Sequence, residues 1–350
     1  MRRELPLLQK KPGVSLVLSG GATKAFYFHI GVLKVLDLEN ISSIVGTSAG
    51  AVAGTLVASG VEADALVASL YQKSVYVPRI DTVVKRLTAA MVFQPAFGHM
   101  ASQGAHTLFA GLRMMLTLPT VHRGDVVSEI LDRLILSQRH APSFFNASEL
   151  ENLMRALLPS DDFHDTPIDL YVTATSLDEH KRAVFNAHVD YDDGVNAFMT
   201  DVPLHRAVLA SSAVPGMFEP VKIKDRYYID GEVRQTLSMD IGLALADTVI
   251  CSHTYHPLYM SNGETVRDEG WYNIVKQSVH IALYERILGW RDVYEQQFPE
   301  KRMIWIEPDP EDREFFLAPE FSFRPELQRR LVESGERAAH RALDKAFART

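Results

Sequence analysis

Two short apolar segments each end in a glycine-rich turn, and a helical pattern follows each turn. Residues 13–18 (GVSLVL) precede Ser19-Gly20-Gly21, and residues 41–45 precede Gly46-Thr47-Ser48-Ala49-Gly50. The helical spacing of apolar residues is clearest over 26–38. Repetition of strand, tight turn and helix predicts an α/β fold whose central sheet is mainly parallel and carries helices on both faces.

Later segments continue this pattern to the end of the chain. The sequence predicts strands at 168–175, 182–187, 226–229, 248–251 and 303–306. It predicts helices at 203–212, 272–294 and 325–347. No internal repeat and no linker rich in Gly, Ser or Pro divides the 350 residues, so we expect a single domain spanning 1–350.

The composition excludes several classes of protein. Hydrophobic residues make up 47% of the chain and charged residues 23%, as in ordinary globular proteins. The net charge of −8 argues against a nucleic-acid-binding protein, which needs clustered Lys and Arg. The single cysteine, Cys251, excludes an intrachain disulfide framework and fits a cytoplasmic protein. We expect no metal and no cofactor, because no residue set has the spacing of either kind of site.

The strongest local signal is Gly46-x-Ser48-x-Gly50. It lies between a β-rich segment and a helix of small residues, which is the setting of a nucleophile elbow. A sharp turn there would lift the hydroxyl above the sheet, and the flanking glycines would let backbone segments approach closely. The free N–H groups at the start of the helix would then face the reacting oxygen. The other interpretation is a tight turn in which Ser48 caps the helix.

A second glycine-rich segment, Ser19-Gly20-Gly21-Ala22-Thr23-Lys24, follows the first strand. Adjacent glycines offer N–H groups that can surround an anion. The segment lacks the G-x-G-x-x-G spacing and the G-K-[ST] ending of nucleotide-binding loops. An oxyanion hole fits it better, because neighbouring parallel strands would place this turn beside Ser48.

These segments, in this order, resemble the patatin-like phospholipase family. Five stretches carry the resemblance: 16–36 (LVLSGGATKAFYFHIGVLKVL), 46–50 (GTSAG), 173–177 (TATSL), 210–220 (ASSAVPGMFEP) and 229–231 (IDG). Taken alone, Asp230-Gly231 would be a common turn at the end of a strand. The resemblance covers roughly 13–60 and 166–251, which would form the catalytic core.

The resemblance implies a three-layer patatin-like fold and a lipid acyl hydrolase with a Ser–Asp dyad. Ser48 would attack a carboxylic ester, Asp230 would take its proton, and an acyl-enzyme would form. The backbone N–H groups of Gly20, Gly21 and Ala22 would hold the oxyanion. The residues that would support these motifs are Lys24, Gly46, Ala49, Gly50 and Gly231. The expected partner is a lipid substrate, a phospholipid or a related lipid, with transient contact to a membrane as a peripheral protein.

The oxyanion segment departs from the family pattern of three glycines, a small residue, Arg and Gly. Ala22 replaces the third glycine, Lys24 the arginine and Ala25 the last glycine. Glu232 follows Asp230-Gly231, where the family often has Gly or Ala. Ala22 keeps its place without strain only where φ is negative, so a positive φ there would reshape the loop.

The segment 61–165 lies outside the resemblance and is expected to be an inserted helical cap, with 261–350 as a C-terminal helical extension. No Asp, Glu, Lys or Arg occurs between Arg86 and Arg113. Buried helices and an apolar lid or membrane-facing surface are both open interpretations. The side chains that could line an acyl channel are Phe93, Phe97, Leu108, Phe109, Met114 and Met115.

Other functions and other catalytic residues also stay open. An acyltransferase would use the same residues with an alcohol acceptor, and a catalytically silent lipid- or partner-binding protein could keep the fold. A histidine could complete a triad with Ser48. The candidates are His29, His122, His205, His253 and His256.

Overall fold

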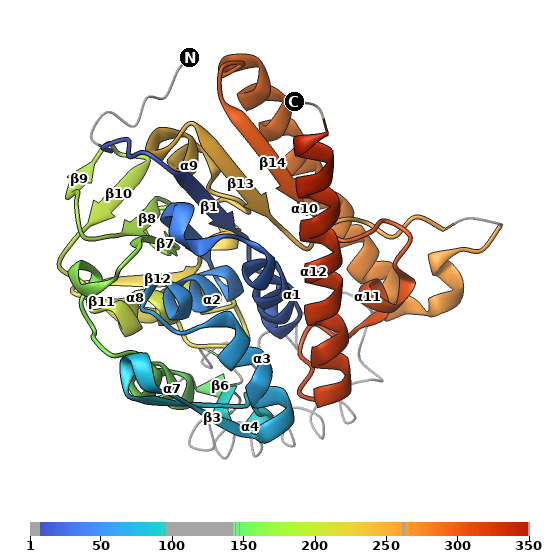
Figure 1. Cartoon of the computed structure of the whole chain (residues 1–350), viewed down its shortest axis with the longest axis horizontal. Coiled ribbons are helices and arrows are strands. Elements are labelled where there is room, and N and C mark those ends of the chain that lie inside the picture. The colour runs from blue at the N-terminus through green and yellow to red at the C-terminus, as the bar shows by residue number, and fades with distance from the viewer. Residues whose placement is uncertain are drawn as a thin grey trace, which may run out of the picture.

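A mostly parallel sheet forms the centre of the molecule (Figure 1). The computed structural model describes residues 8–92, 94–95, 143, 145–146, 148–260 and 263–348. Five strands run parallel side by side, in the order β14 (Arg302–Ile306), β13 (Thr248–Ser252), β1 (Val14–Leu18), β2 (Ile41–Thr47) and β7 (Asp169–Ser176). This arrangement confirms the expected α/β class.

The sheet continues beyond β7 with antiparallel pairs. Beyond β7 lie β8 (Arg182–Phe185), β10 (Asn196–Met199) and β9 (Tyr191–Asp192). A hairpin of β11 (Val221–Ile223) and β12 (Arg226–Asp230) pairs with the other edge of β7. Both β8 and β12 pair antiparallel with β7, and β11 pairs with β12. The sheet is therefore mixed at this end: β7 lies between β2 and β8, and β12 pairs with β7 on the same edge as β2, beyond the end of β2.

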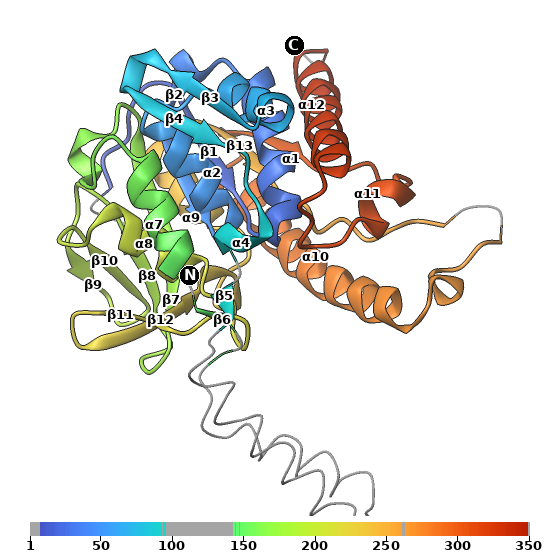
Figure 2. The same ribbon diagram turned by 90° about the horizontal axis from the view of Figure 1, so that it is seen from below.

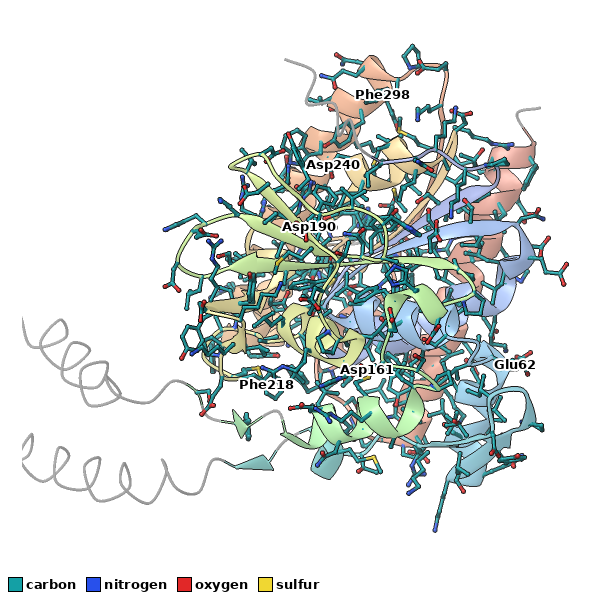
Figure 3. All side chains as sticks on the ribbon, turned by 90° about the vertical axis from the view of Figure 1, so that its left-hand side faces the viewer. Glu62, Asp161, Asp190, Phe218, Asp240 and Phe298 are labelled. Atoms are coloured by element: carbon teal, nitrogen blue, oxygen red, sulfur yellow. The ribbon has the colours of Figure 1, made fainter. Side chains whose placement is uncertain are left out.

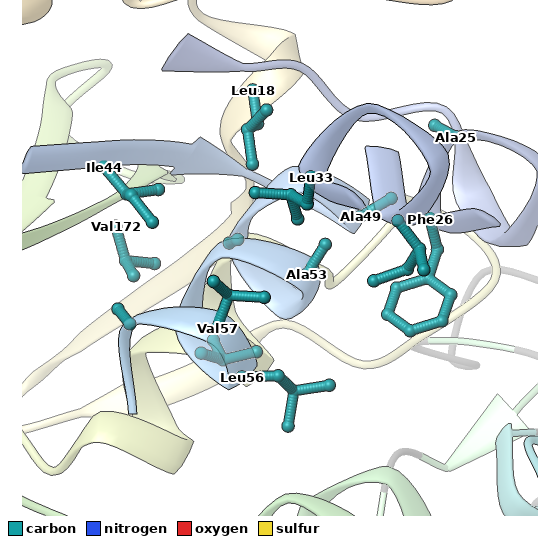
Figure 4. Close-up of a cluster of buried hydrophobic side chains, with 14 of the residues drawn as sticks. Leu18, Ala25, Phe26, Leu33, Ile44, Ala49, Ala53, Leu56, Val57 and Val172 are labelled. Atoms are coloured by element: carbon teal, nitrogen blue, oxygen red, sulfur yellow. The ribbon is translucent and has the colours of Figure 1, made fainter. Parts of the chain in front are cut away.

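Helices cover both faces because the central strands are apolar on both sides. In β1, Leu16 and Leu18 belong to one buried cluster, whereas Val17 belongs to the other. The first face is covered by α1 (Ala22–Val35), α2 (Ala49–Ala58), α8 (Leu204–Ser211) and α12 (Pro325–Phe347). The second is covered by α9 (Met239–Leu245) and α10 (Trp271–Gln297). Figure 4 shows side chains of α1 and α2 meeting those of the sheet in the first cluster.

Helix α12 packs directly on α1, as Figure 2 shows from below. A glycine in each helix allows this approach. A Cβ on Gly31 would lie 2.0 Å from the carbonyl oxygen of Val332, and one on Gly335 would lie 2.0 Å from that of Phe28. The C-terminal helix is thus part of the layer that carries the start of α1.

The described part of 61–165 contains both helices and strands. Its elements are α3 (Ala63–Gln72), β3 (Ser74–Val77), β4 (Thr82–Lys85), α4 (Ala89–Val92), β5 (Gln94–Pro95), β6 (Phe145–Asn146) and α7 (Ser148–Leu157). The strands β3 and β4 form a hairpin, and β5 pairs with β6. The predicted channel residues Phe93, Phe97, Leu108, Phe109, Met114 and Met115 lie outside the described residues, and the helical cap stays a prediction.

The predicted strands and helices agree with the structure within a few residues at most ends. The helix predicted at 26–38 instead spans Ala22–Val35. It begins early because tertiary contacts hold its first turn: the Lys24 N–H donates to the Glu320 carbonyl at 3.1 Å. The short elements α9, α11 (Arg313–Leu317) and β10 were not predicted.

Length and apolar composition decide whether a described helix could span a membrane. None of the described helices alone is long and apolar enough to cross a bilayer. Together, α2 and α3 reach the required length and composition, but the chain bends by 109° between them.

Candidate active site

Ser48 occupies a strained turn between β2 and α2. Its backbone has φ 51° and ψ −120°, a region that costs non-glycine residues of the order of 1–3 kcal/mol. Glycine is required on both sides. A Cβ on Gly46 would lie 2.6 Å from the Ala51 Cα, and one on Gly50 would lie 2.5 Å from the Leu18 carbonyl oxygen. The sequence G-x-S-x-G therefore forms the sharp, closely packed turn that it predicts.

The Ser48 side chain does not cap α2. This finding removes the interpretation of Ser48 as a simple helix cap. Its N–H instead donates to the Ser211 hydroxyl at 2.8 Å, and Ser211 donates to the Thr173 carbonyl at 2.7 Å. Both serines are buried. The hydroxyl of Ser48 is left available for other contacts.

Asp230 and Ser48 come together along one edge of β7. In the sheet, Thr47 pairs with Thr173 of β7, and Asp230 pairs with the next residue, Ala174. The Ser48 hydroxyl is near enough to the Asp230 carboxyl group to lower its pKa by hydrogen bonding. Gly231 is needed for this approach, because a Cβ there would lie 2.5 Å from the Thr173 carbonyl oxygen.

The serine-rich end of α8 holds both residues in place. Ser211 accepts the N–H of Ser48, and two residues later the Ala213 carbonyl accepts the N–H of Asp230 at 3.0 Å. This is the segment 210–220 on which the resemblance partly rests. Its physical role, which the sequence did not indicate, is to join the two turns.

Burial raises the pKa of Asp230 to about 6. The hydrogen bonds from Ser48 and from the Glu232 N–H act in the opposite direction. The Glu232 N–H donates to Asp230 Oδ1 at 2.9 Å. A carboxylate with this pKa is ionised at neutral pH and is a stronger base than an ordinary aspartate.

The glycine-rich segment after β1 lies beside this pair. A Cβ on Gly20 would lie 2.8 Å from the Ser48 Cβ, so the two residues are immediate neighbours. Gly21 has φ 125° and Ala22 has φ 58°. The Ala22 position is therefore one of positive φ, and replacement of glycine by alanine there costs about 1–2 kcal/mol. As the first residue of α1, Ala22 has an N–H without an intrahelical acceptor.

Glu232 lies against the same segment. Its Oε1 accepts the N–H of Gly20 at 2.6 Å. Burial, followed by the charge of Asp230, raises the pKa of Glu232 to about 8, whereas hydrogen bonding with Tyr255 acts against this rise. The sequence marked Glu232 only as a departure from the family pattern. Its contact spans 212 positions in the chain, so no local pattern could have revealed it.

Lys24 does not point toward Ser48. Its side chain is buried beside Glu320, at 3.5 Å, and its ammonium group lies 4.4 Å from the centre of the Phe315 ring. Burial lowers the pKa of Lys24 to about 7. Lys276 also contacts Glu320, at 3.0 Å. Lys24 thus links the start of α1 to the loop before α12.

The described histidines proposed for a triad are engaged elsewhere. His29 contacts the Ser252 hydroxyl and the Ser19 carbonyl, and burial lowers its pKa to about 4. His205 contacts Asp161, which Figure 3 labels, at 2.6 Å. His253 lies 3.3 Å from Glu307, and His256 contacts the Pro257 carbonyl. His122 lies outside the described residues.

An apolar pocket opens at Ser48. Its walls come from α1, α2, α3, α7 and the loop after α8, so the described part of 61–165 supplies one side. The apolar lining includes Phe26, Val52, Leu56, Leu66, Leu87, Val92, Leu150, Met154, Leu157, Val214, Phe218 and Phe321. Ala22 and Ser48 also lie in this lining. The reacting hydroxyl of an acyl hydrolase would therefore face hydrocarbon.

This chain is similar to several proteins of known structure and to one protein family. Among solved structures, VipD from Legionella pneumophila is similar over 99% of this chain and 71% of its own, with 13% identity and a TM-score of 0.39. ExoU from Pseudomonas aeruginosa, in its complex with SpcU, is similar over 96% of this chain, with 17% identity and a TM-score of 0.31. The chain covers 53% of the ExoU structure. None of the curated proteins compared with the sequence matches it.

The family comparison is the decisive one. The model of the patatin-like phospholipases matches residues 16–242. This range contains both glycine-rich turns, the central strand β7, the end of α8 and the Asp230-Gly231 turn. Members of this family are lipid acyl hydrolases, and the chain belongs to the patatin-like phospholipase family.

Proposed function

We propose that this chain hydrolyses carboxylic esters of phospholipids or related lipids through a dyad of Ser48 and Asp230. The observation that carries the proposal is the contact of the Ser48 hydroxyl with the buried Asp230 carboxyl group at the mouth of an apolar pocket. An apolar pocket at a nucleophile suits an acyl chain, and a raised carboxyl pKa suits proton transfer near neutral pH.

The reaction would proceed in two halves. Ser48 Oγ attacks the ester carbonyl carbon while its proton passes to the Asp230 carboxylate. The tetrahedral oxyanion accepts hydrogen bonds from the backbone N–H groups of the Gly20–Ala22 segment. The bond to the alcohol then breaks, and the proton on Asp230 passes to the departing oxygen. Water attacks the acyl carbonyl carbon while Asp230 takes a proton from that water. The bond from the acyl carbon to Ser48 Oγ then breaks, Asp230 returns the proton to Oγ, and the fatty acid leaves.

The strained backbone of Ser48 supports the same role. The Ser48 hydroxyl does not cap helix α2 and lies near the Asp230 carboxyl group, which would limit the reorganisation needed before attack. Lys24, Gly46, Gly50 and Gly231 would act by shaping these turns rather than by touching substrate, whereas Ala49 also lines the pocket.

Active-site labelling tests the proposal. A fluorophosphonate should modify Ser48 in the wild type and leave Ser48→Ala unmodified, with the site identified by mass spectrometry. Hydrolysis of mixed phospholipid vesicles should be lost in Ser48→Ala and fall at least about 100-fold in Asp230→Asn. Unimpaired lipid hydrolysis by Ser48→Ala would refute the dyad. Addition of an alcohol acceptor to the same assay separates hydrolysis from acyl transfer.

A catalytically silent lipid-binding protein is the second candidate. The observation in its favour is the bond between the Gly20 N–H and Glu232, because this N–H is one that the oxyanion would need. Such a protein would bind vesicles stably but would not react with the fluorophosphonate under any condition.

A further inference from the structure

Glu232 occupies the space in which the reaction would take place. Its Oε1 lies 2.6 Å from the Gly20 nitrogen, within the range of a strong hydrogen bond. The missing Cβ of Gly20 would lie 2.8 Å from the Ser48 Cβ and 2.9 Å from the Glu232 Cγ. Gly20, Ser48 and Glu232 therefore meet at one point, with a carboxyl oxygen already on the amide.

An ester bound for attack by Ser48 would have to place its carbonyl oxygen on the same N–H. One N–H group donates a strong bond to one acceptor at a time, so the carboxyl oxygen and the substrate oxygen compete. When Glu232 is ionised, its negative charge also opposes the charge that develops on the substrate oxygen.

We propose that the Glu232 carboxyl group is an internal ligand of the oxyanion segment that inhibits the resting enzyme and must leave the Gly20 N–H before an ester can react. This inference rests on the function proposed above for Ser48. It assigns to Glu232 a regulatory contact rather than a part in the chemistry.

The contact can open by movement of a side chain alone. The N–H of Glu232 is fixed on Asp230 Oδ1, at 2.9 Å, at the start of the short 3-10 helix Gly231–Val233. The carboxyl group can therefore rotate away while Asp230 keeps its place. Tyr255 holds the carboxyl group by hydrogen bonding, so its hydroxyl should strengthen the inhibition.

The inhibition should depend on pH. The charged and titratable groups that face Glu232 are Asp230, Tyr255 and Arg286. Because burial and Asp230 raise the pKa of Glu232 to about 8, the carboxyl group is mostly neutral at pH 6.5 and mostly ionised at pH 9. The ionised form binds the N–H more strongly and repels an oxyanion, so inhibition should increase as pH rises through 8.

The test measures the rate at which a fluorophosphonate labels Ser48 at pH 6.5 and at pH 9. Glu232→Ala should react roughly 10- to 100-fold faster than the wild type at pH 9, and the difference should be smaller at pH 6.5. Glu232→Gln keeps an oxygen that can accept a hydrogen bond from the Gly20 N–H, but its side chain cannot ionise. The labelling rate of this variant should therefore not decline above pH 8. Glu307→Ala, at a partly buried glutamate near His253, is the matched control and should label at the wild-type rate.

Thermal melting shows whether each variant folds. If Glu232→Ala does not fold, Tyr255→Phe is used in its place. Loss of the Tyr255 hydroxyl should loosen the Glu232 carboxyl group and raise the labelling rate about threefold or more at pH 9. If the wild type is labelled at Ser48 and neither folded variant is labelled faster, the inference is overturned but the proposed function stays intact. Failure of every variant to label at Ser48 would overturn both.

Discussion

The N–H of Ser48 donates to the hydroxyl of Ser211, 2.8 Å away, although 163 positions separate the two residues in the chain. Ser211 in turn donates to β7, so the strained turn at Ser48 is fixed to the neighbouring strand and not only to its own helix. The geometry of the proposed nucleophile therefore depends on a side chain that takes no part in the chemistry.

Replacement of Ser211 should disturb that turn. In Ser211→Ala the buried N–H of Ser48 loses its acceptor, so we expect a loss of about 1–3 kcal/mol in the free energy of unfolding. Fluorophosphonate labelling of Ser48 should slow by at least tenfold. Ser212→Ala is the matched control, because Ser212 approaches the Ser48 carbonyl only at 3.5 Å. Equal labelling rates in the two variants would contradict this role.

The acylation rate should depend on the ionisation of Asp230. Asp230 accepts a proton only as the carboxylate, and burial raises its pKa to about 6. The rate should therefore fall as pH decreases through 6, about tenfold for each further pH unit. Rapid-mixing kinetics with a short-chain ester between pH 4.5 and 7.5 would measure this. A rate that is flat down to pH 4.5 would show that Asp230 is not the base.

The same raised pKa predicts that Asp230 destabilises the fold at neutral pH. Above pH 6 the folded chain contains a buried charge that the unfolded chain exposes to water, whereas below about pH 4 both states bind the proton. At pH 7.5 the free energy of unfolding of Asp230→Asn should therefore exceed that of the wild type by up to about 3 kcal/mol. The difference should vanish near pH 4. Urea unfolding at both pH values tests the sign.

The contact between α1 and α12 should tolerate no side chain at Gly31. A Cβ there would lie 2.0 Å from the Val332 carbonyl oxygen, so Gly31→Ala should force the helices apart and lower the free energy of unfolding by several kcal/mol. Gly289→Ala in α10 is the control. Apart from the chain neighbours and nearby backbone of its own helix, no atom lies within 4 Å of the added Cβ. Gly289→Ala should therefore be neutral or stabilise by up to about 1 kcal/mol. Similar melting temperatures for the two variants would contradict the close packing.

The apolar pocket should set the length of acyl chain that reacts. Val52 lies in the pocket lining on α2, one turn after Ser48. Val52→Phe should reduce kcat/KM for long-chain esters by tenfold or more and change that for acetyl esters by less than threefold. Val52→Ala should leave long-chain hydrolysis in place. An equal loss for both chain lengths in Val52→Phe would show that the acyl group binds elsewhere.

Local patterns in the sequence determined the elements and the two turns. Apolar runs of strand length, followed by glycines, predict β1 and β2. The pattern of residue types that marks a buried parallel strand and its turn lies within one short segment of the chain. The same holds for the long helices at the C-terminus. The G-x-S-x-G pattern between a strand and a helix indicates Ser48 by itself. Asp230 depends on the family resemblance, since Asp230-Gly231 alone would be an ordinary turn.

Only the tertiary structure decided which groups meet. The approach of Asp230 to Ser48 depends on β2 and β12 pairing with the same edge of β7, one after the other. The burial that raises the pKa of Asp230 exists only once the helices are packed. The bond of Glu232 to the Gly20 N–H and that of Ser211 to the Ser48 N–H join parts of the chain far apart in sequence. Spacing along a chain fixes periodicity, whereas contacts of this kind follow from how strands pair and helices pack, which no local pattern encodes.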